Sequence, residues 1–232
     1  MADVDREVPS CQSCASTVRW RSIVHVLSSE LFGESLALPD FPIRRDIVGI
    51  GLSDWRGYAA PLANKLGYTN TFYHTEPKLD ITVESPDLTG SLDFLISSDV
   101  FEHVAPPVSV AFENARQLLK PGGMMVLTVP YGKGCDHLEH FPDLYEYEIV
   151  EQAGHSVLRN VTRNGVEQRF ENLVFHGGPG ATLEMRRFSE SSLIGLLQAT
   201  GFEDVKIYDQ PVFEYGIYWH WDWSLPIAAR VR

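Results

Sequence analysis

The sequence predicts an α/β protein with a doubly wound, mainly parallel sheet, and three observations lead to that prediction. Apolar runs of strand length alternate with segments of helical periodicity along most of the chain. Several of the helical segments end at glycine, which is a common helix stop. The run at 124–131 is apolar and rich in β-branched residues, as expected of a central strand buried on both faces. In such sheets, ligands bind at the carboxyl ends of the strands.

The expected elements follow one another in a regular order. A leading amphipathic helix covers 18–32, and it is followed by strand 44–52, helix 58–68 closed by Gly67, strand 69–77, a very short strand 79–82, strand 91–99, helix 108–123, strand 124–131, helix 189–202 and strand 203–210. Between the last two strands the chain carries an insertion. Within it, Asn164-Gly165 predicts a hairpin over 158–175, because this dipeptide favours a tight turn between strands.

We expect one domain, because 232 residues suffice for a single core of ordinary size. Within it we separate four segments, which are an N-terminal leader and helix (1–43), an α/β core (44–208), an insertion over the ligand site (131–180) and an aromatic C-terminal segment (209–232). In that last segment, Trp219, Trp221 and Trp223 alternate. They suit either stacking on sugar rings, together with Tyr218, or packing as one face of an edge strand, and the alternation favours packing.

Composition narrows the choice of partner. The net charge of −12 opposes unaided binding to nucleic acid or to an anionic membrane, because both reward clusters of Lys and Arg. The N-terminus lacks the features of a signal peptide, and no apolar run approaches the roughly 20 residues of a membrane span. We therefore expect a cytoplasmic protein that acts on a small molecule, and we leave a homodimer open.

Cysteine usage is sparse, with Cys11, Cys14 and Cys135. An odd count of three fits a reducing compartment better than a disulfide framework. Cys11 and Cys14 form a Cys-x-x-Cys pair, which is half of a zinc knuckle without a second half elsewhere in the sequence. We prefer the interpretation of two ordinary thiols.

The stretch SSDVFEHV, at 97–104, places three titratable side chains directly after a buried strand. Asp99, Glu102 and His103 would each be costly to bury without a partner. If a helix begins near Asp99, the spacing i, i+3 and i+4 brings all three onto one face. The pattern therefore indicates either a functional site or a solvated helix start.

Over residues 44–208 the order of elements resembles the class I S-adenosylmethionine-dependent methyltransferases, which have a Rossmann-like fold. Four pieces carry the resemblance, namely the glycine turn GIGLS (49–53), the acid Glu76 closing the second strand, the stretch DFLISSDVFEHV (93–104) and LLKPGGMMVLTVP (118–130). The last two together are the most specific. A glycine turn alone occurs in many nucleotide-binding folds.

The resemblance implies S-adenosylmethionine as the cofactor. The turn at 49–53 would carry the methionine carboxylate, since glycine allows close approach and a helix N-terminus offers free amides. Glu76 would accept the ribose hydroxyls, Asp80 would take the adenine amino group, and Ile81 would cover the ring. The family usually has an acid where this chain has Ile47, and Asp54 is expected to compensate. The implied cofactor residues are Gly49, Gly51, Ser53, Asp54, Glu76, Asp80, Ile81, Ser98 and Asp99.

The spacing of Asp99, Glu102 and His103 is also similar to the divalent-metal motif of plant-type small-RNA 2′-O-methyltransferases and some ubiquinone-pathway O-methyltransferases. In those relatives the loop after the fifth strand completes the metal shell, and His140 is the nearest match here, with His137 and Glu139 as competitors. Two carboxylates and two imidazoles suit Mn²⁺, Fe²⁺, Co²⁺ or Zn²⁺ better than Mg²⁺. The metal-free alternative stays open, with His103 or His140 as general base.

The acceptor is indicated by a weaker resemblance. FHGGPGATLEMRRFS (175–189), NTFYHTEPKLDI (70–81) and EHFPDL (139–144) resemble methyltransferases found alongside polysaccharide and glycosylated-metabolite pathways. We expect O-methylation of a hydroxyl on a sugar or related small metabolite, with the 131–180 insertion as acceptor lid. The pocket would include His176, Gly177, Gly178, Glu184 and Arg186, unless Arg186 forms an ion pair at the edge of the core. The alternatives are a catalytically silent binding or regulatory module and a nicotinamide-binding fold.

Overall fold

A six-stranded sheet lies at the centre of the computed structural model, which describes residues 5–134, 136–152, 154–176 and 182–232. Its strands are β1 (Arg44–Leu52), β2 (Leu66–Thr71), β3 (Leu92–Ser98), β4 (Leu119–Thr128), β13 (Phe202–Ile207) and β14 (Ile227–Val231). The order across the sheet is β13-β14-β4-β3-β1-β2. Strands β2, β1, β3 and β4 are parallel, whereas β14 and β13 are antiparallel to their neighbours. The predicted mainly parallel α/β fold is confirmed.

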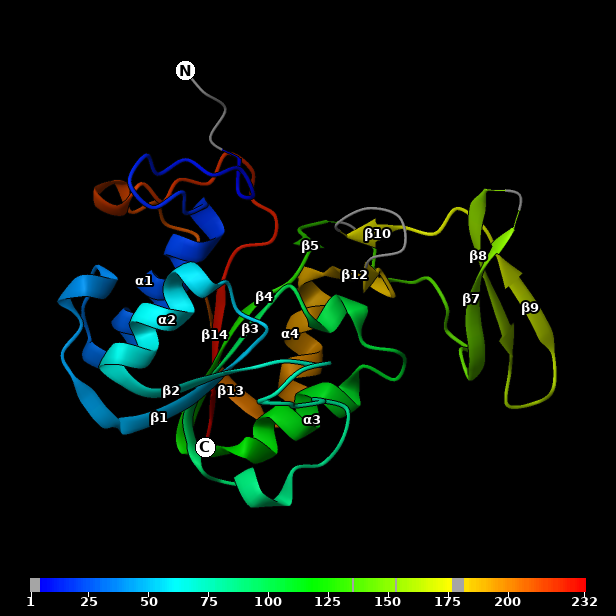
Figure 1. Cartoon of the computed structure of the whole chain (residues 1–232), viewed down its shortest axis with the longest axis horizontal. Helices are drawn as coiled ribbons and strands as arrows, with labels where there is room; N and C mark the ends of the chain where they lie inside the picture. The colour runs from blue at the N-terminus through cyan, green and yellow to red at the C-terminus, as the bar shows by residue number, and fades with distance from the viewer. Residues whose placement is uncertain (1–4, 135, 153, 177–181) are drawn as a thin grey trace.

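Helices cover both faces of this sheet (Figure 1). They are α1 (Val18–Phe32), α2 (Arg56–Lys65), α3 (Ser109–Leu118) and α4 (Glu190–Ala199), with the 3-10 turns η1 (Leu38–Asp40), η2 (Pro86–Leu88), η3 (Phe101–His103) and η4 (Phe213–Tyr215). Helix α1 agrees with the predicted 18–32. The Thr17 hydroxyl caps its first turn, and Gly33 ends it in the left-handed conformation.

The apolar central strands serve two cores, because side chains alternate between the faces of a strand. Phe94 and Ile96 of β3 pack with α1 and α2, whereas Leu95 between them packs with α3 and α4. In β4, Met124 and Met125 divide in the same way. This explains why the strands appear as continuous apolar runs in the sequence.

Several predicted boundaries are wrong between β1 and β3. The second helix ends at Lys65 and not at Gly67, which lies inside β2. Gly67 is needed there because a Cβ would lie 2.6 Å from the carbonyl oxygen of Arg45 in β1. Strand β2 therefore starts and ends earlier than the predicted 69–77. The predicted strand 79–82 forms a turn, with only an isolated bridge between Phe72 and Lys78 nearby.

The insertion is built from short strands. They are β5 (Tyr131–Gly132), β6 (Leu138–Glu139), β7 (Glu146–Gln152), β8 (His155–Val161), β9 (Glu167–Phe170), β10 (Phe175–His176), β11 (Thr182–Leu183) and β12 (Arg186–Ser189). The predicted hairpin at Asn164-Gly165 is confirmed as β8 and β9. Together with β7 it forms a three-stranded lobe that projects from the main body (Figure 1). A small core that includes Leu158 and Phe141 lies beneath it.

The C-terminal segment differs from the prediction. No strand covers 219–223, and the chain instead continues into β14, between β4 and β13. Trp219 packs against the core as expected, but Trp221 is 66% exposed and Trp223 is 39% exposed. The alternation of tryptophans was therefore not the mark of an edge strand with one buried face.

Two further features concern the whole chain. Within the described residues, no helix is both long enough and apolar enough to cross a membrane. Cys11 and Cys14 are free thiols near the start of the described chain, and Cys135 lies outside the described residues.

Candidate active site

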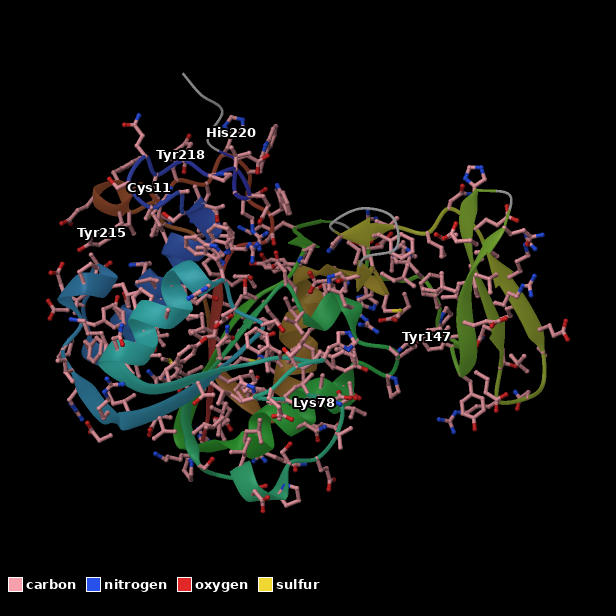
Figure 2. All side chains as sticks on the ribbon, in the orientation of Figure 1. Cys11, Lys78, Tyr147, Tyr215, Tyr218 and His220 are labelled. Carbon is pink, nitrogen blue, oxygen red and sulfur yellow. The ribbon has the colours of Figure 1, made fainter. Side chains whose placement is uncertain are left out.

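A cavity of about 1090 Å³ lies at the carboxyl ends of β1, β2 and β3. Strand β1 pairs with both β2 and β3, so the chain winds away from β1 in two directions, which is where doubly wound sheets bind ligands. The cavity is large enough for a nucleoside-sized ligand and a small second molecule. Tyr147 of β7 and Trp223 also line it, so the lobe and the C-terminal segment contribute to its wall. Figure 2 shows Tyr147 reaching from the lobe toward the main body.

The turn after β1 contributes Leu52 and Ser53 to the cavity wall. Ser53 has a left-handed backbone (φ 58°), and its amide donates to the carbonyl of Thr71 at the end of β2. Gly49 and Gly51 lie inside β1 and do not line the cavity. A Cβ at Gly49 would collide with the ring of Phe94, so packing requires this glycine.

Asp54 lies beneath the turn and not in the cavity. It is buried, and it accepts a 2.6 Å hydrogen bond from the Tyr68 hydroxyl. Its backbone is held by two hydrogen bonds to the Asn70 side chain. Burial raises the pKa of Asp54 to about 6, because the hydroxyl of Tyr68 compensates only in part for lost water. A Cβ at Gly51 would collide with this Asp54–Tyr68 pair. Asp54, which was expected to compensate for Ile47 in cofactor binding, therefore stabilises the turn and does not line the cavity.

The acid predicted to close the second strand does not do so. Strand β2 ends at Thr71, and Glu76 lies five residues further on, exposed and accepting a hydrogen bond from the amide of Lys78. Glu76 is not part of the cavity wall, so its ribose contact stays a prediction without support from this geometry. Asp80 and Ile81 do line the cavity, as the resemblance implied. Asp80 also caps the turn through the amide and hydroxyl of Thr82.

Asp99 lines the cavity at the end of β3, where two arginines from the N-terminal leader bind it. Arg6 donates to both carboxylate oxygens at 2.9 and 3.1 Å, and the Arg19 side chain lies 3.2 Å away. The Thr128 hydroxyl adds a further bond, and Ser98 accepts from Arg19 without lining the cavity. Although burial opposes it, Arg6 and Arg19 hold the pKa of Asp99 down at about 2. Asp99 is therefore an ionised and fully paired carboxylate.

The predicted convergence of three side chains on one helix face is wrong. Residues 101–103 form the single 3-10 turn η3, and helix α3 begins only at Ser109. Asp99 turns toward the arginines, while Glu102 and His103 turn toward the insertion. The physical reason is the left-handed backbone of Asp99 (φ 53°), which prevents a continuous helix from starting there.

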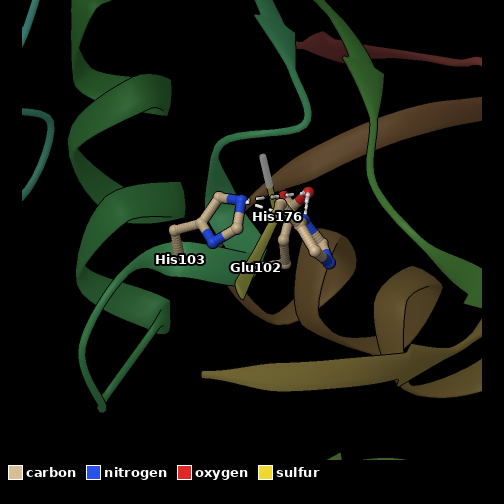
Figure 3. A group of neighbouring side chains, drawn as sticks. All are labelled: Glu102, His103 and His176. Atoms are coloured by element: carbon tan, nitrogen blue, oxygen red, sulfur yellow. Dashed lines mark hydrogen bonds and ion pairs between the residues drawn. The ribbon is translucent and has the colours of Figure 1, made fainter. Parts of the chain in front are cut away.

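Glu102, His103 and His176 form a cluster (Figure 3). The His176 Nδ1 lies 3.2 Å from the His103 Nε2, and the Glu102 Oε1 lies 3.7 and 3.8 Å from these two nitrogens. Glu102 is fully buried, and burial together with the charge of Asp99 raises its pKa well above the usual range. Burial also lowers the pKa of His103. Both imidazoles line the cavity.

A second layer of polar residues holds the imidazoles. Glu184 receives the His176 Nε2 at 2.9 Å on one oxygen and the His140 Nε2 at 2.8 Å on the other. His140 thus lies behind the cluster and is not one of the three converging residues. The sequence resemblance placed His140 in the metal set, and the geometry puts His176 there instead.

Arg186 stabilises the 3-10 turn η3 that carries Glu102 and His103. It is fully buried, it pairs with Glu139, and it donates to the carbonyl oxygen of Phe101 at 2.8 Å. The ion-pair interpretation of Arg186 is therefore confirmed, and Glu139 is occupied by it. Of the other expected pocket residues, His176 lines the cavity, and Gly177 and Gly178 lie outside the described residues.

Sequence reasoning missed the two leader arginines. Arg6 and Arg19 are separated from Asp99 by most of the first half of the chain, and only the fold brings them to the cavity. One available signal was the isolated acid at the end of a buried strand, which predicts a cationic partner. The sequence alone does not say which of the 19 Lys and Arg residues is that partner.

A family model described as a methyltransferase domain matches residues 38–207, and the chain belongs to that family. The match covers β1 to β13 and therefore includes the whole of the cavity edge formed by β1, β2 and β3. No curated protein matches the sequence.

Solved structures agree with this fold. The structure of an amino pentose methyltransferase from Micromonospora echinaspora, with S-adenosylmethionine bound, has a TM-score of 0.50 and 14% identity, over 94% of this chain and 92% of that one. A sugar N-methyltransferase from a Streptoalloteichus species has a TM-score of 0.51 and 12% identity, over 95% and 89%. The CurJ carbon methyltransferase has a TM-score of 0.50 and 16% identity, over 93% and 55%. The family match and the shared fold together define the chain as a methyltransferase.

Proposed function

We propose that this methyltransferase transfers the methyl group of S-adenosylmethionine to a hydroxyl oxygen of a sugar or a related small metabolite. One observation carries the proposal. A single cavity is lined both by the turn after β1 and the Asp80-Ile81 loop and by two imidazoles. The methyl donor and its acceptor therefore have adjoining places.

The cofactor end of the cavity suits a nucleoside with a zwitterionic tail. In our proposal the sulfonium nucleotide lies over the turn at Ser53, with Asp80 toward the adenine amino group and Ile81 against the ring. Asp99 is paired with Arg6 and Arg19, so it orients the two guanidinium groups at the same cavity. Arg6 and Arg19 still have free N–H donors, which can bind the carboxylate of the cofactor's methionine tail.

The acceptor end favours oxygen over nitrogen. A neutral amine attacks a methyl group with its own lone pair, whereas a neutral hydroxyl is a poor nucleophile and profits from losing its proton. His103 directs its Nδ1 to the carbonyl oxygen of Leu183 and His176 directs its Nε2 to Glu184, so the other nitrogen of each neutral ring is a lone pair at the cavity wall. An acceptor hydroxyl held there has a base within reach.

Support for a sugar comes from the outer wall and from the relatives. Tyr147 and Trp223 line the cavity with partly exposed aromatic rings, which are suited to packing against the C–H face of a sugar. The two sugar methyltransferases among the solved structures share the fold over nearly the whole chain. One of these relatives is an amino pentose methyltransferase and the other a sugar N-methyltransferase, so the methylated atom has to be tested directly.

Methyl transfer requires little covalent chemistry from the protein itself. The sulfonium of the cofactor is the leaving group, and the chain has to align the acceptor oxygen with the methyl group and exclude water. Here the β7–β9 lobe and Trp223 close over one side of the cavity. As long as their inward nitrogens hold no metal ion, the imidazoles receive the proton as the C–O bond forms.

The test is methyl transfer from radiolabelled S-adenosylmethionine to matched pairs of sugars that differ only in hydroxyl against amino at one carbon. We expect a labelled methyl ether from the hydroxyl compounds. Labelling of the amino sugars alone would contradict O-methylation. Calorimetric titration with the cofactor is run in parallel, because no binding would instead favour a catalytically silent module.

A further inference from the structure

Two imidazole nitrogens, the Nε2 of His103 and the Nδ1 of His176, face each other at 3.2 Å. The Nδ1 of His103 lies 2.8 Å from the carbonyl oxygen of Leu183, which can only accept, so this nitrogen carries the proton. The Nε2 of His176 donates in the same way to the Glu184 carboxylate at 2.9 Å. In the neutral rings the inward nitrogens are then lone pairs, and they lie 3.2 Å apart. Such a contact is repulsive unless a positive charge lies between or beside them.

A carboxylate points at the same spot. The Oε1 of Glu102 lies 3.7 Å from the His103 nitrogen and 3.8 Å from the His176 nitrogen. The side chain is fully buried, and neither carboxylate oxygen has a hydrogen-bond partner among the described residues. A buried carboxylate of this kind requires a cation or a proton donor, because burial without a partner is costly.

We propose that Glu102, His103 and His176 bind one divalent transition-metal ion. Two imidazole nitrogens and one carboxylate oxygen are ligands of Zn²⁺, Fe²⁺, Co²⁺ and Mn²⁺, whereas Mg²⁺ and Ca²⁺ prefer oxygen alone. The three donor atoms are 3.2 to 3.8 Å apart. Ligands at ~2.1 Å around a tetrahedral ion are separated by about 3.4 Å, so only small adjustments are needed.

The surroundings of the two imidazoles agree with this assignment. Metal-binding histidines commonly donate their other N–H to a carbonyl or a carboxylate, which fixes the tautomer. Here Leu183 supplies the carbonyl for His103, and Glu184 supplies the carboxylate for His176. His140 holds the second oxygen of Glu184 and thereby fixes its orientation.

The ion has a role only if the proposed O-methylation is right, and its binding is independent of that role. Three protein ligands leave a coordination position for another group. His103 and His176 line the cavity, so an acceptor hydroxyl can take that position, where the ion lowers its pKa. The hydroxyl proton leaves to solvent, the oxygen forms a bond to the methyl carbon, and the C–S bond breaks with its electron pair on sulfur. The products are a methyl ether, S-adenosylhomocysteine and one proton.

The experiment is metal binding by the full chain after removal of bound metal with a chelator. Calorimetry with Zn²⁺ and the visible absorption of added Co²⁺ give affinity and coordination without any assay of activity. We expect one equivalent of metal in the wild type and at least a tenfold loss of affinity in Glu102→Gln and in His176→Ala. Since Glu102 is buried and its variant is at risk of misfolding, the partly exposed His176 provides the safer substitution. His155→Ala, at an exposed histidine of β8, is the matched control.

The outcomes separate the two proposals. Loss of metal in His176→Ala with unchanged S-adenosylmethionine affinity supports the site. Wild-type protein that takes up no stoichiometric metal, or a His176→Ala variant that keeps wild-type affinity, overturns it and assigns the positive charge to a proton shared by the imidazoles. Metal binding without transfer to any hydroxyl compound leaves the site intact and contradicts the proposed function instead.

Discussion

Asp99 and Glu102 are acidic residues three positions apart, and their surroundings shift their pKa values in opposite directions. Asp99 lines the cavity and is paired with Arg6 and Arg19, which hold its pKa at about 2. Glu102 is fully buried beside His103 and His176, its carboxylate oxygens have no hydrogen-bond partner among the described residues, and its pKa is raised well above the usual range. The comparison teaches that the partner supplied by distant elements, and not the local sequence, decides what a buried acid can do.

Asp54 is an intermediate case between these two. It is buried like Glu102, but it accepts one short hydrogen bond from Tyr68. Its pKa is raised to about 6, between the values of an acid paired with two arginines and an acid with no partner. The series from Asp99 through Asp54 to Glu102 can be tested by removing one carboxylate at a time.

The largest effect is expected for Asp99→Ala, which removes the less exposed of the two anions paired with Arg6 and Arg19 and, among the described residues, leaves them only Glu7. Breaking a buried pair of this kind costs about 3 to 5 kcal/mol, and we expect the unfolding free energy to fall by about 4 kcal/mol at pH 7. Urea denaturation measures it. Asp46→Ala removes an exposed ion pair with Arg44 and is the control, for which we expect little change in stability.

The same prediction has a pH dependence whose sign is fixed. The pKa of Asp99 is lowered from 3.8 to about 2 in the folded state, so its stabilising effect is complete above pH 4 and is lost as the pH falls toward 2. The difference in stability between wild type and Asp99→Asn should therefore shrink over this range. A difference that stays constant down to pH 2 would contradict the pairing with the arginines.

Asp54→Asn is expected to act in the opposite direction. Because burial raises the pKa from 3.8 to about 6, the wild type loses stability as the pH rises through this window. The shift of about two units corresponds to about 3 kcal/mol, and asparagine still offers an oxygen to the Tyr68 hydroxyl. We expect the variant to be more stable by about 2 to 3 kcal/mol at pH 7, with no difference below pH 4. Thermal unfolding at a series of pH values measures it, and equal curves at pH 7 would show that Asp54 is not strained.

The fold was largely predictable because its signals are local. Alternating periodicity identified β1, β3, β4, α1, α3 and α4, and Asn164-Gly165 identified the hairpin of the lobe. The errors concern residues whose role depends on a neighbouring strand. Gly67 appeared as a helix stop, but it lies in β2 because the backbone of β1 passes too close for a side chain. The antiparallel strand β14 was missed because it is only five residues long and two of them are alanines, which are uncommon in strands.

Only the part of the site that directly follows β3 in the sequence could be predicted. Asp99, Glu102 and His103 follow a recognisable strand, so their place near the carboxyl end of β3 could be inferred. The predicted helix then wrongly placed the three side chains on one face, because the left-handed conformation of Asp99 has no signal in the sequence. His176 was known as a pocket candidate, but its contact with His103 depends on how the insertion folds back over the sheet.

The smallest predicted effect tests the acceptor end through a residue behind the cluster. Glu184→Gln keeps the size of the side chain but offers one oxygen where His176 and His140 now have two. Loss of such an orienting carboxylate typically costs 10-fold or more in metal affinity, so we expect a weakening of about 10-fold, or about 1.4 kcal/mol. Calorimetry with Zn²⁺ measures it, and Glu171→Gln, which alters an exposed ion pair of the lobe, is the control. Since Asp99 is untouched, the affinity for S-adenosylmethionine should stay within about twofold of the wild type. If cofactor binding fell together with metal binding, the two ends of the cavity would be coupled, and the contrast between Asp99 and Glu102 would have to be explained by one shared electrostatic network.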